Sequence, residues 1–217
     1  MADYASRRRV MVDTQVRPSD VTKFPIIQAM LNVPRERYVP DAAREAAYVG
    51  DGVRLGDGRV LLEPRTFAKL LDALDVGPGD VVLDIGCGLG YSVAVLAWMA
   101  EFVVGVEDDE TRVDEAQATL SDTGIDNAAI VVGPLAEGAP KSGPYDVILI
   151  EGGVEQVPQA VIDQLKDGGR IACLFAEGRL GVARAGIKTD GRVSWRYLFN
   201  AGAPLLPGFE KDVAFTF

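Results

Sequence analysis

The feature that most constrains this chain is an apolar run that leads into three glycines and then into a helical pattern. Val81–Ile85 is typical of a buried strand, and the helical pattern starts at Tyr91. Between them, Gly86, Gly88 and Gly90 stand at alternate positions. A strand, a glycine turn and a helix N-terminus in this order leave bare backbone beside the positive end of a helix dipole. The segment therefore predicts a ligand that lies against the turn.

The spacing of these glycines separates the candidate ligands. A dinucleotide-binding turn reads G-x-G-x-x-G, which would place its third glycine where this chain has Tyr91. The pattern here is Asp84-x-Gly86-x-Gly88-x-Gly90. It resembles the turn of the class I S-adenosylmethionine (SAM)-dependent methyltransferases. The resemblance implies that Asp84, the glycines and Tyr91 bind SAM and its product, S-adenosylhomocysteine (SAH).

A second acidic residue follows the next predicted strand. Phe102–Val106 reads as that strand, and Glu107 stands at its end. This lies about 20 positions after Gly86, the interval at which nucleoside-binding folds place an acidic residue on the ribose hydroxyls. We expect Glu107 to bind the cofactor ribose. After the third strand comes Gly133-Pro134-Leu135, and we expect Leu135 to lie beside the adenine.

Strand and helix patterns alternate from residue 64 onward. Strands are predicted at 81–85, 102–106, 129–132, 146–150 and 170–175, with helices at 64–75, 91–100, 110–121 and 158–166. Runs rich in β-branched and aromatic residues at 193–199 and 212–217 predict two antiparallel strands that complete the sheet. The pattern predicts an α/β fold: a doubly wound, Rossmann-like, mostly parallel seven-stranded sheet.

The first 60 residues have a different pattern. Helical segments at 4–16 and 24–31 are followed by a glycine-containing stretch, Gly50–Gly58, which we interpret as a loop. We expect an N-terminal helical cap carrying a substrate loop at 1–60 and a SAM-binding methyltransferase domain at 61–217. The two are expected to form one compact unit.

Composition limits the partners and the chemistry. The 217 residues carry a formal net charge of −10, whereas a nucleic-acid surface needs clustered Lys and Arg. No apolar run approaches the roughly 18 residues that a membrane span requires. The absence of histidine excludes Ser-His-Asp and Cys-His mechanisms and argues against a metal site. Two cysteines fit free thiols in a reducing compartment. We therefore expect a cytoplasmic monomer without nucleic-acid, membrane or metal partners.

Several motifs resemble those of the protein-L-isoaspartate O-methyltransferase family. Ahead of the glycine turn, the chain has Met-Val-x-x-Gln-Val at 11–16, Val-Pro-Arg-Glu-Arg-Tyr-Val-Pro at 33–40, Ala-Tyr at 47–48 and Pro-Gly-Asp at 78–80. Behind it, the chain has Pro-Tyr-Asp at 144–146 and Leu-Lys-Asp-Gly-Gly-Arg at 165–170. The resemblance implies methylation of the abnormal carboxylate of isoaspartyl residues in a protein or peptide substrate, as a step of protein repair. A carboxylate is already nucleophilic at neutral pH, so this chemistry needs positioning more than a general base.

The chain departs from the family in the active-site loop, which in the family reads approximately Gly-Gln-Thr-Ile-Ser-Ala-Pro-His. The aligned segment here is Gly58-Arg59-Val60-Leu61-Leu62-Glu63-Pro64-Arg65. The serine position therefore holds Leu62 and the histidine position Arg65, so no catalytic residue can be assigned. Arg59, Val60, Leu62, Glu63, Pro64 and Arg65 are the substrate-loop candidates.

Two further departures lie at strand ends. Pro134 replaces an aspartate expected to bind the adenine amino group, and Glu151-Gly152-Gly153 replaces a small, alanine-rich run. Three hypotheses remain open. The first is an isoaspartyl-type methyltransferase with weak or lost isoaspartyl activity, and the second is a methyltransferase with another acceptor, such as a small molecule. The third is a non-catalytic SAM-binding protein.

Overall fold

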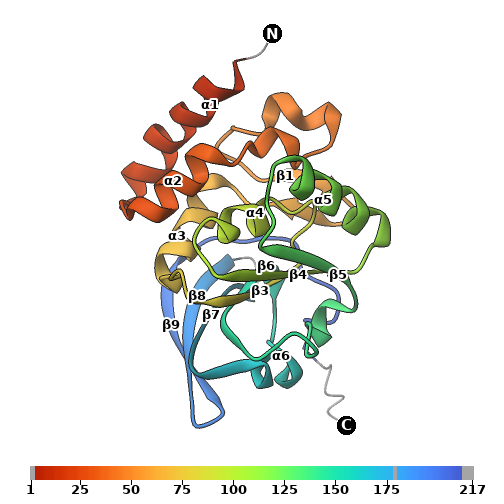
Figure 1. Ribbon diagram of the computed structural model, residues 1–217. Helices are drawn as coiled ribbons and strands as arrows, with labels where there is room; N and C mark the ends of the chain where they lie inside the picture. Colours follow the sequence, from red (N-terminus) through yellow and green to blue (C-terminus); the bar gives the residue numbers. More distant parts are fainter. Residues whose placement is uncertain (1–2, 178–179, 212–217) are drawn as a thin grey trace.

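The computed structural model describes residues 3–177 and 180–211, and a seven-stranded sheet forms its centre. The strand order is β5-β4-β3-β6-β7-β8-β9, with the first five strands parallel and the last two antiparallel (Figure 1). The strands are β3 (Val81–Ile85), β4 (Phe102–Glu107), β5 (Ala128–Val132), β6 (Tyr145–Val154), β7 (Leu165–Glu177), β8 (Leu180–Thr189) and β9 (Arg192–Asn200). The predicted fold class is confirmed.

Helices cover both faces of this sheet. They are α1 (Tyr4–Met11), which continues as a π-helical segment (Val12–Val16), α2 (Phe24–Asn32), α3 (Pro64–Leu74), α4 (Tyr91–Ala97), α5 (Glu110–Asp122) and α6 (Gln159–Asp163). Short 3-10 turns lie at Arg17–Ser19, Arg35–Arg37, Asp41–Ala46 and Leu135–Glu137. In Figure 1 the N-terminal helices lie together at one end of the molecule, and α6 lies at the opposite end.

Alternation along the central strands sends side chains into two apolar cores. Val82 and Val103 enter the larger core, which also contains Phe67 of α3. Leu83 and Val104, their chain neighbours, enter the smaller core on the other face, with Val161 of α6 and Phe209. Strands buried on both faces read as continuous apolar runs, which is why the sequence predicted them well.

The segment expected to be a loop at Gly50–Gly58 forms most of a hairpin. Strand β1 (Val53–Gly56) pairs antiparallel with β2 (Arg59–Leu61). Gly56, Asp57 and Gly58 all have positive φ, so they form the turn that joins the strands. The expectation of a loop was wrong because these glycines mark the turn of a hairpin.

The C-terminal part of the sheet also differs from the prediction. Strand β8 was not expected, and the predicted strand at 193–199 corresponds to β9. The predicted strand at 212–217 lies outside the described residues. Helix α6 is shorter than the predicted helix at 158–166 because β7 already begins at Leu165.

Residues 1–60 share their core with the rest of the chain. Met11 and Met30 from the N-terminal segment belong to the same apolar cluster as Val95 and Phe199. The continuous cluster favours one compact unit. The boundary at residue 60 stays a prediction.

Candidate cofactor and acceptor site

The glycine turn lies between the carboxyl end of β3 and the start of α4. Gly86, Gly88 and Gly90 have φ values of 77°, 56° and 88°, a conformation that residues with a Cβ atom rarely adopt. The Gly86 amide donates to the Val106 carbonyl at 2.9 Å, which fixes the turn beside β4. The predicted strand, turn and helix are therefore in place.

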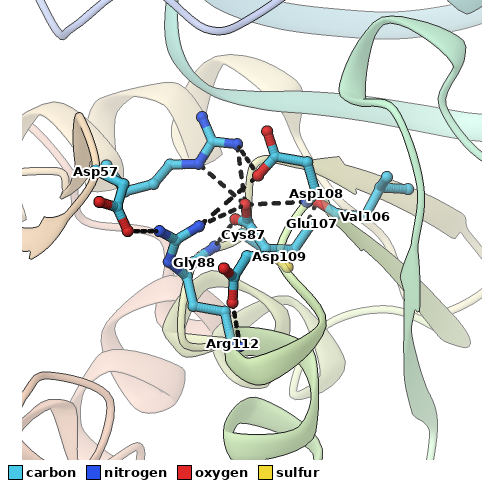
Figure 2. Close-up of polar contacts among 9 residues, drawn as sticks. Asp57, Cys87, Gly88, Val106, Glu107, Asp108, Asp109 and Arg112 are labelled. Atoms are coloured by element: carbon cyan, nitrogen blue, oxygen red, sulfur yellow. Dashed lines mark hydrogen bonds and ion pairs between the residues drawn. The ribbon is translucent and has the colours of Figure 1, made fainter.

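Glu107 lies at the end of β4 beside this turn, and its side chain is fully buried. Its Oε2 accepts a hydrogen bond from the Gly88 amide at 2.8 Å. Its Oε1 accepts from Nε and Nη2 of Arg59 at 3.0 and 2.9 Å, and from Nη1 of Arg112 at 3.3 Å. Figure 2 shows Arg112 and the Gly88 backbone converging on this carboxylate. Arg59 also donates to Asp108 Oδ1 at 2.9 Å, so four charged groups form one network.

The β1–β2 hairpin supplies part of this network. Arg112 Nη2, from α5, donates to Asp57 Oδ2 at 2.9 Å, which ties the hairpin turn to the helix (Figure 2). Leu55 reaches the glycine turn: a Cβ added to Gly88 would lie 2.5 Å from Leu55 Cδ1. On the other side, a Cβ at Gly86 would lie 3.3 Å from Leu206 Cδ1. Side chains of the same chain thus cover the turn.

Two buried carboxyl groups lie deeper in the site. Neither oxygen of Asp84 has a hydrogen-bond partner among the described residues, and the same holds for Oε1 of Glu151 in β6. Burial, reinforced by the charge of Glu107, raises the pKa of Asp84 to about 7. Burial and the charge of Asp84 raise the pKa of Glu151 well above its usual range. Tyr91 and Ser92 also have buried hydroxyls without a partner in the described part of the chain.

Arg35 joins the site to the N-terminal segment. This fully buried side chain donates from Nε to the Ala47 carbonyl at 2.6 Å and from Nη2 to the Leu62 carbonyl at 2.7 Å. Its guanidinium carbon lies 4.8 Å from the centre of the Tyr91 ring. Arg35 thereby fixes the substrate loop against α4.

The substrate-loop candidates occupy different environments. Leu62 is buried, Val60 is half-buried and Pro64 begins α3. Glu63 Oε1 accepts from the Thr66 hydroxyl at 2.5 Å. Arg65 is exposed, with Nη1 4.0 Å from Glu63 Oε1. The sixth candidate, Arg59, points away from its loop neighbours to Glu107.

A cleft of about 680 Å³ lies beside this loop. Its walls come from the β1–β2 hairpin, the loop before α3 and the stretch 201–204. Charged residues line it: Asp51, Arg54, Asp57, Arg59 and Glu63. A charged open cleft of this kind can hold a polar acceptor segment.

Other predicted residues contribute packing. Leu135 is 2% exposed and belongs to the smaller apolar core. Both cysteines are buried and free, and burial raises the pKa of Cys87 well above its usual range, so this thiol is unreactive.

Within the described residues no group of three or more His, Cys, Asp or Glu is arranged to hold a metal ion. None of the helices described has the length and apolar character needed to cross a membrane.

Sequence reasoning missed three residues of the site. Arg112 follows Glu107 by little more than one helical turn, but a single arginine on an amphipathic helix gives no specific signal. Arg35 stands inside the Val-Pro-Arg-Glu motif, which was read only as a family resemblance. Glu151 was noted as a departure and not as a site residue, because its burial beside Asp84 depends on strand order.

The residue types at this site fit SAM, whereas the hairpin covers the place that SAM would occupy. Glycines with positive φ, an acidic strand end at Glu107 and the unpartnered carboxyl of Asp84 match a ligand that carries hydroxyl and ammonium donors. Leu55 and Arg59 lie over the turn and on Glu107. In this conformation SAM would therefore have to displace the hairpin.

Fold and glycine turn together define a Rossmann-like methyltransferase. A structure titled protein-L-isoaspartate O-methyltransferase superposes with a TM-score of 0.81 at 26% identity, covering 93% of this chain and 66% of that one. A structure from Plasmodium falciparum, titled a putative protein-L-isoaspartate O-methyltransferase in complex with SAH, superposes with a TM-score of 0.78 at 20% identity. It covers 95% of this chain and 99% of that one, and it supports the fold alone.

Sequence comparisons give the family. The family model described as Protein-L-isoaspartate(D-aspartate) O-methyltransferase (PCMT) matches residues 7–198. A protein-L-isoaspartate O-methyltransferase of Opitutus terrae is 36% identical over 166 residues, 76% of this chain and 71% of that protein. One of Methanoculleus marisnigri is 32% identical over 186 residues, 86% of this chain and 84% of that protein. The chain belongs to the PCMT family of SAM-dependent methyltransferases.

Proposed function

We propose that the protein binds SAM at the Gly86–Gly90 turn and transfers its methyl group to an acceptor in a protein or peptide held in the adjoining cleft. The observation that carries this proposal is the position of the cleft. It borders the substrate loop, which leads directly into α3, and Phe67 of α3 packs against Tyr91 just after the glycine turn. SAM supplies an electrophilic methyl group when bound. The chain's own residues orient the acceptor and exclude water, since an ionised carboxylate needs no base.

Isoaspartyl methylation by the native protein is expected to be weak. Leu62 stands at the family's serine position, is 3% exposed and brings an apolar side chain to the cleft wall. A missing hydrogen bond costs roughly 1 kcal/mol, and more where an ionised acceptor is left unpaired. With Val60 at the threonine position, the two losses amount to about 2–4 kcal/mol, or roughly 30- to 1000-fold in kcat/KM. Arg65 does not offset this, because a nearby charge does not relieve the steric filling by Leu62 and Arg65 does not line the cleft.

The test is methyl transfer from labelled SAM to an isoaspartyl peptide by the native protein, Leu62→Ser and Leu62→Ala. The two variants remove similar volume from a buried position, and only serine adds a hydroxyl. A gain confined to Leu62→Ser would assign the defect to the missing hydroxyl, and a gain in both would assign it to steric filling. Native turnover as fast as that of a family member with the usual loop would contradict the expectation of weak activity.

A second candidate function is methyl transfer to an acceptor that is not a carboxylate. Val60 and Leu62 support it, because these apolar side chains line the cleft where the family's loop carries polar groups. Labelling of components of a cell extract, without labelling of the isoaspartyl peptide, would favour this candidate. Binding of SAH without any labelling would favour a non-catalytic binding protein.

The remaining expectations belong to this proposal. Two buried free thiols support a reducing compartment, and we propose a cytoplasmic protein. The net charge of −10 supports a protein without a nucleic-acid partner. A monomer that does not bind membranes is proposed as well. We keep Leu135 as a neighbour of the adenine on the strength of its place after β5.

A further inference from the structure

The glycine turn meets a side chain of its own chain at the surface where a cofactor would lie. The hairpin residue Leu55 approaches Gly88 so closely that even a methyl group on Gly88 would meet its Cδ1 at 2.5 Å. A ligand can contact the backbone of a glycine turn directly, because no side chain projects from it. In this structure the side chain of Leu55 occupies that position.

Donors from the protein saturate one oxygen of Glu107 and occupy part of the other. Its Oε1 accepts from Arg59, from Arg112 and from the Asp108 amide at 3.1 Å, while Oε2 accepts from Gly88. A carboxylate offers about four acceptor positions, so little capacity remains for two ribose hydroxyls. Arg59 supplies two of these bonds, and its side chain is only 4% exposed. It is therefore the group that a ribose must replace.

We propose that Arg59 and Leu55 act as an intramolecular competitor of the cofactor, with Arg59 bound where the ribose binds and Leu55 where the ligand meets Gly88. Arg59 is thus an affinity-determining residue for SAM. The inference rests on the proposed SAM binding. The apparent dissociation constant then equals the intrinsic one divided by the fraction of molecules whose hairpin is displaced.

The tip of the hairpin is the part that can be displaced, because Val53 and Leu61 at its base are buried in the larger core. Strands β1 and β2 pair with each other and form a sheet separate from the central one. Besides Arg59, the hairpin turn is tied to α5 by the pair of Asp57 and Arg112, in which the Asp57 side chain is 86% exposed. A pair with one partner so exposed contributes little, so the contacts of Arg59 and Leu55 are the ones that hold the hairpin tip in place.

The experiment measures SAH binding by calorimetry for the native protein, Arg59→Gln and Leu55→Ala. Glutamine keeps a polar side chain while removing the charge and the fork that holds Glu107. We expect Arg59→Gln to bind SAH at least about tenfold more tightly, which corresponds to roughly 1.4 kcal/mol, and Leu55→Ala to bind several-fold more tightly. The matched control is Arg37→Gln, which loses the same charge from an exposed pair with Asp122. Its affinity should equal that of the native protein.

Hydrogen exchange gives a second readout on the native protein. Saturating SAH should accelerate amide exchange in residues 54–60, because the cofactor releases the hairpin tip. Equal SAH affinity of the native protein, Arg59→Gln and Leu55→Ala would overturn the proposal that Arg59 and Leu55 compete with the cofactor, while leaving the proposed SAM binding intact. Absence of SAH binding in all three proteins would overturn both proposals. If circular dichroism shows Arg59→Gln to be unfolded, Leu55→Ala and the exchange measurement decide.

Discussion

At the scale of single residues, the most informative group is Asp84, a carboxyl buried without a partner. Its pKa of about 7 in the folded protein lies above the ordinary value of 3.8, so the folded state holds its proton more tightly than the unfolded state does. The contribution of this tighter proton binding to the stability of the fold is fully present below pH 4 and is lost as the pH rises toward 7. At neutral pH, Asp84 therefore weakens the fold.

Asp84→Asn tests this directly. The native protein should lose stability between pH 4 and pH 8 because Asp84 ionises, whereas the variant has no carboxyl group at this position. The unfolding free energy of the variant minus that of the native protein should therefore increase by at most about 4 kcal/mol over this range. Urea denaturation at both pH values measures it. Asp122→Asn, at an exposed surface position, serves as the control and should show only a small change. A difference independent of pH would mean that Asp84 is ionised in the folded protein.

At the scale of elements, the glycine turn is the unit on which the proposed ligand binding depends. Gly88→Ala adds a methyl group at a φ of 56°, which costs about 1–2 kcal/mol, and places it against Leu55 and the surface where the ligand is proposed to lie. SAH affinity should fall at least about tenfold with the circular dichroism spectrum retained.

Gly124→Ala is the matched control for that substitution. Gly124 also has positive φ, at 73°, and nothing lies within 4 Å of an added Cβ. The control carries the same backbone strain without reaching the turn, so it should lose stability and keep SAH affinity. Equal SAH affinity in both variants would mean that the turn serves only packing.

The same scale shows what the sequence could predict. The strands β3, β4, β6 and β7 were found because buried central strands are apolar runs, and the turn was found because its glycines are local signals. The edge strand β5 is also an apolar run, although its last two residues are exposed. The β1–β2 hairpin was missed because Gly50–Gly58 has the composition of a loop. The contact of Arg59 with Glu107 joins residues 48 positions apart, and no local pattern encodes it. The expectation that Glu107 binds the ribose came from its interval after Gly86, which is a local signal, and it stays a prediction. The protein partners of Glu107 depend on the hairpin and could not be predicted in this way.

At the scale of the whole molecule, Arg35 connects the N-terminal segment, the substrate loop and α4. It satisfies the carbonyls of Ala47 and Leu62 and packs on the ring of Tyr91. Its positive charge also opposes the rise in the pKa of Glu151. If the chain is one unit, removing this contact should weaken the whole molecule in a single transition.

Arg35→Met keeps an unbranched apolar side chain and removes the guanidinium. Two buried carbonyls lose their donor, at about 1–3 kcal/mol each, so the free energy of unfolding should fall by about 2–6 kcal/mol. Thermal unfolding followed by circular dichroism should show one transition at a lower Tm. Arg37→Met, two positions along the chain at an exposed site, should change stability by no more than about 0.5 kcal/mol. Two separate transitions in Arg35→Met would show instead that residues 1–60 unfold independently, and that Arg35 holds two units together.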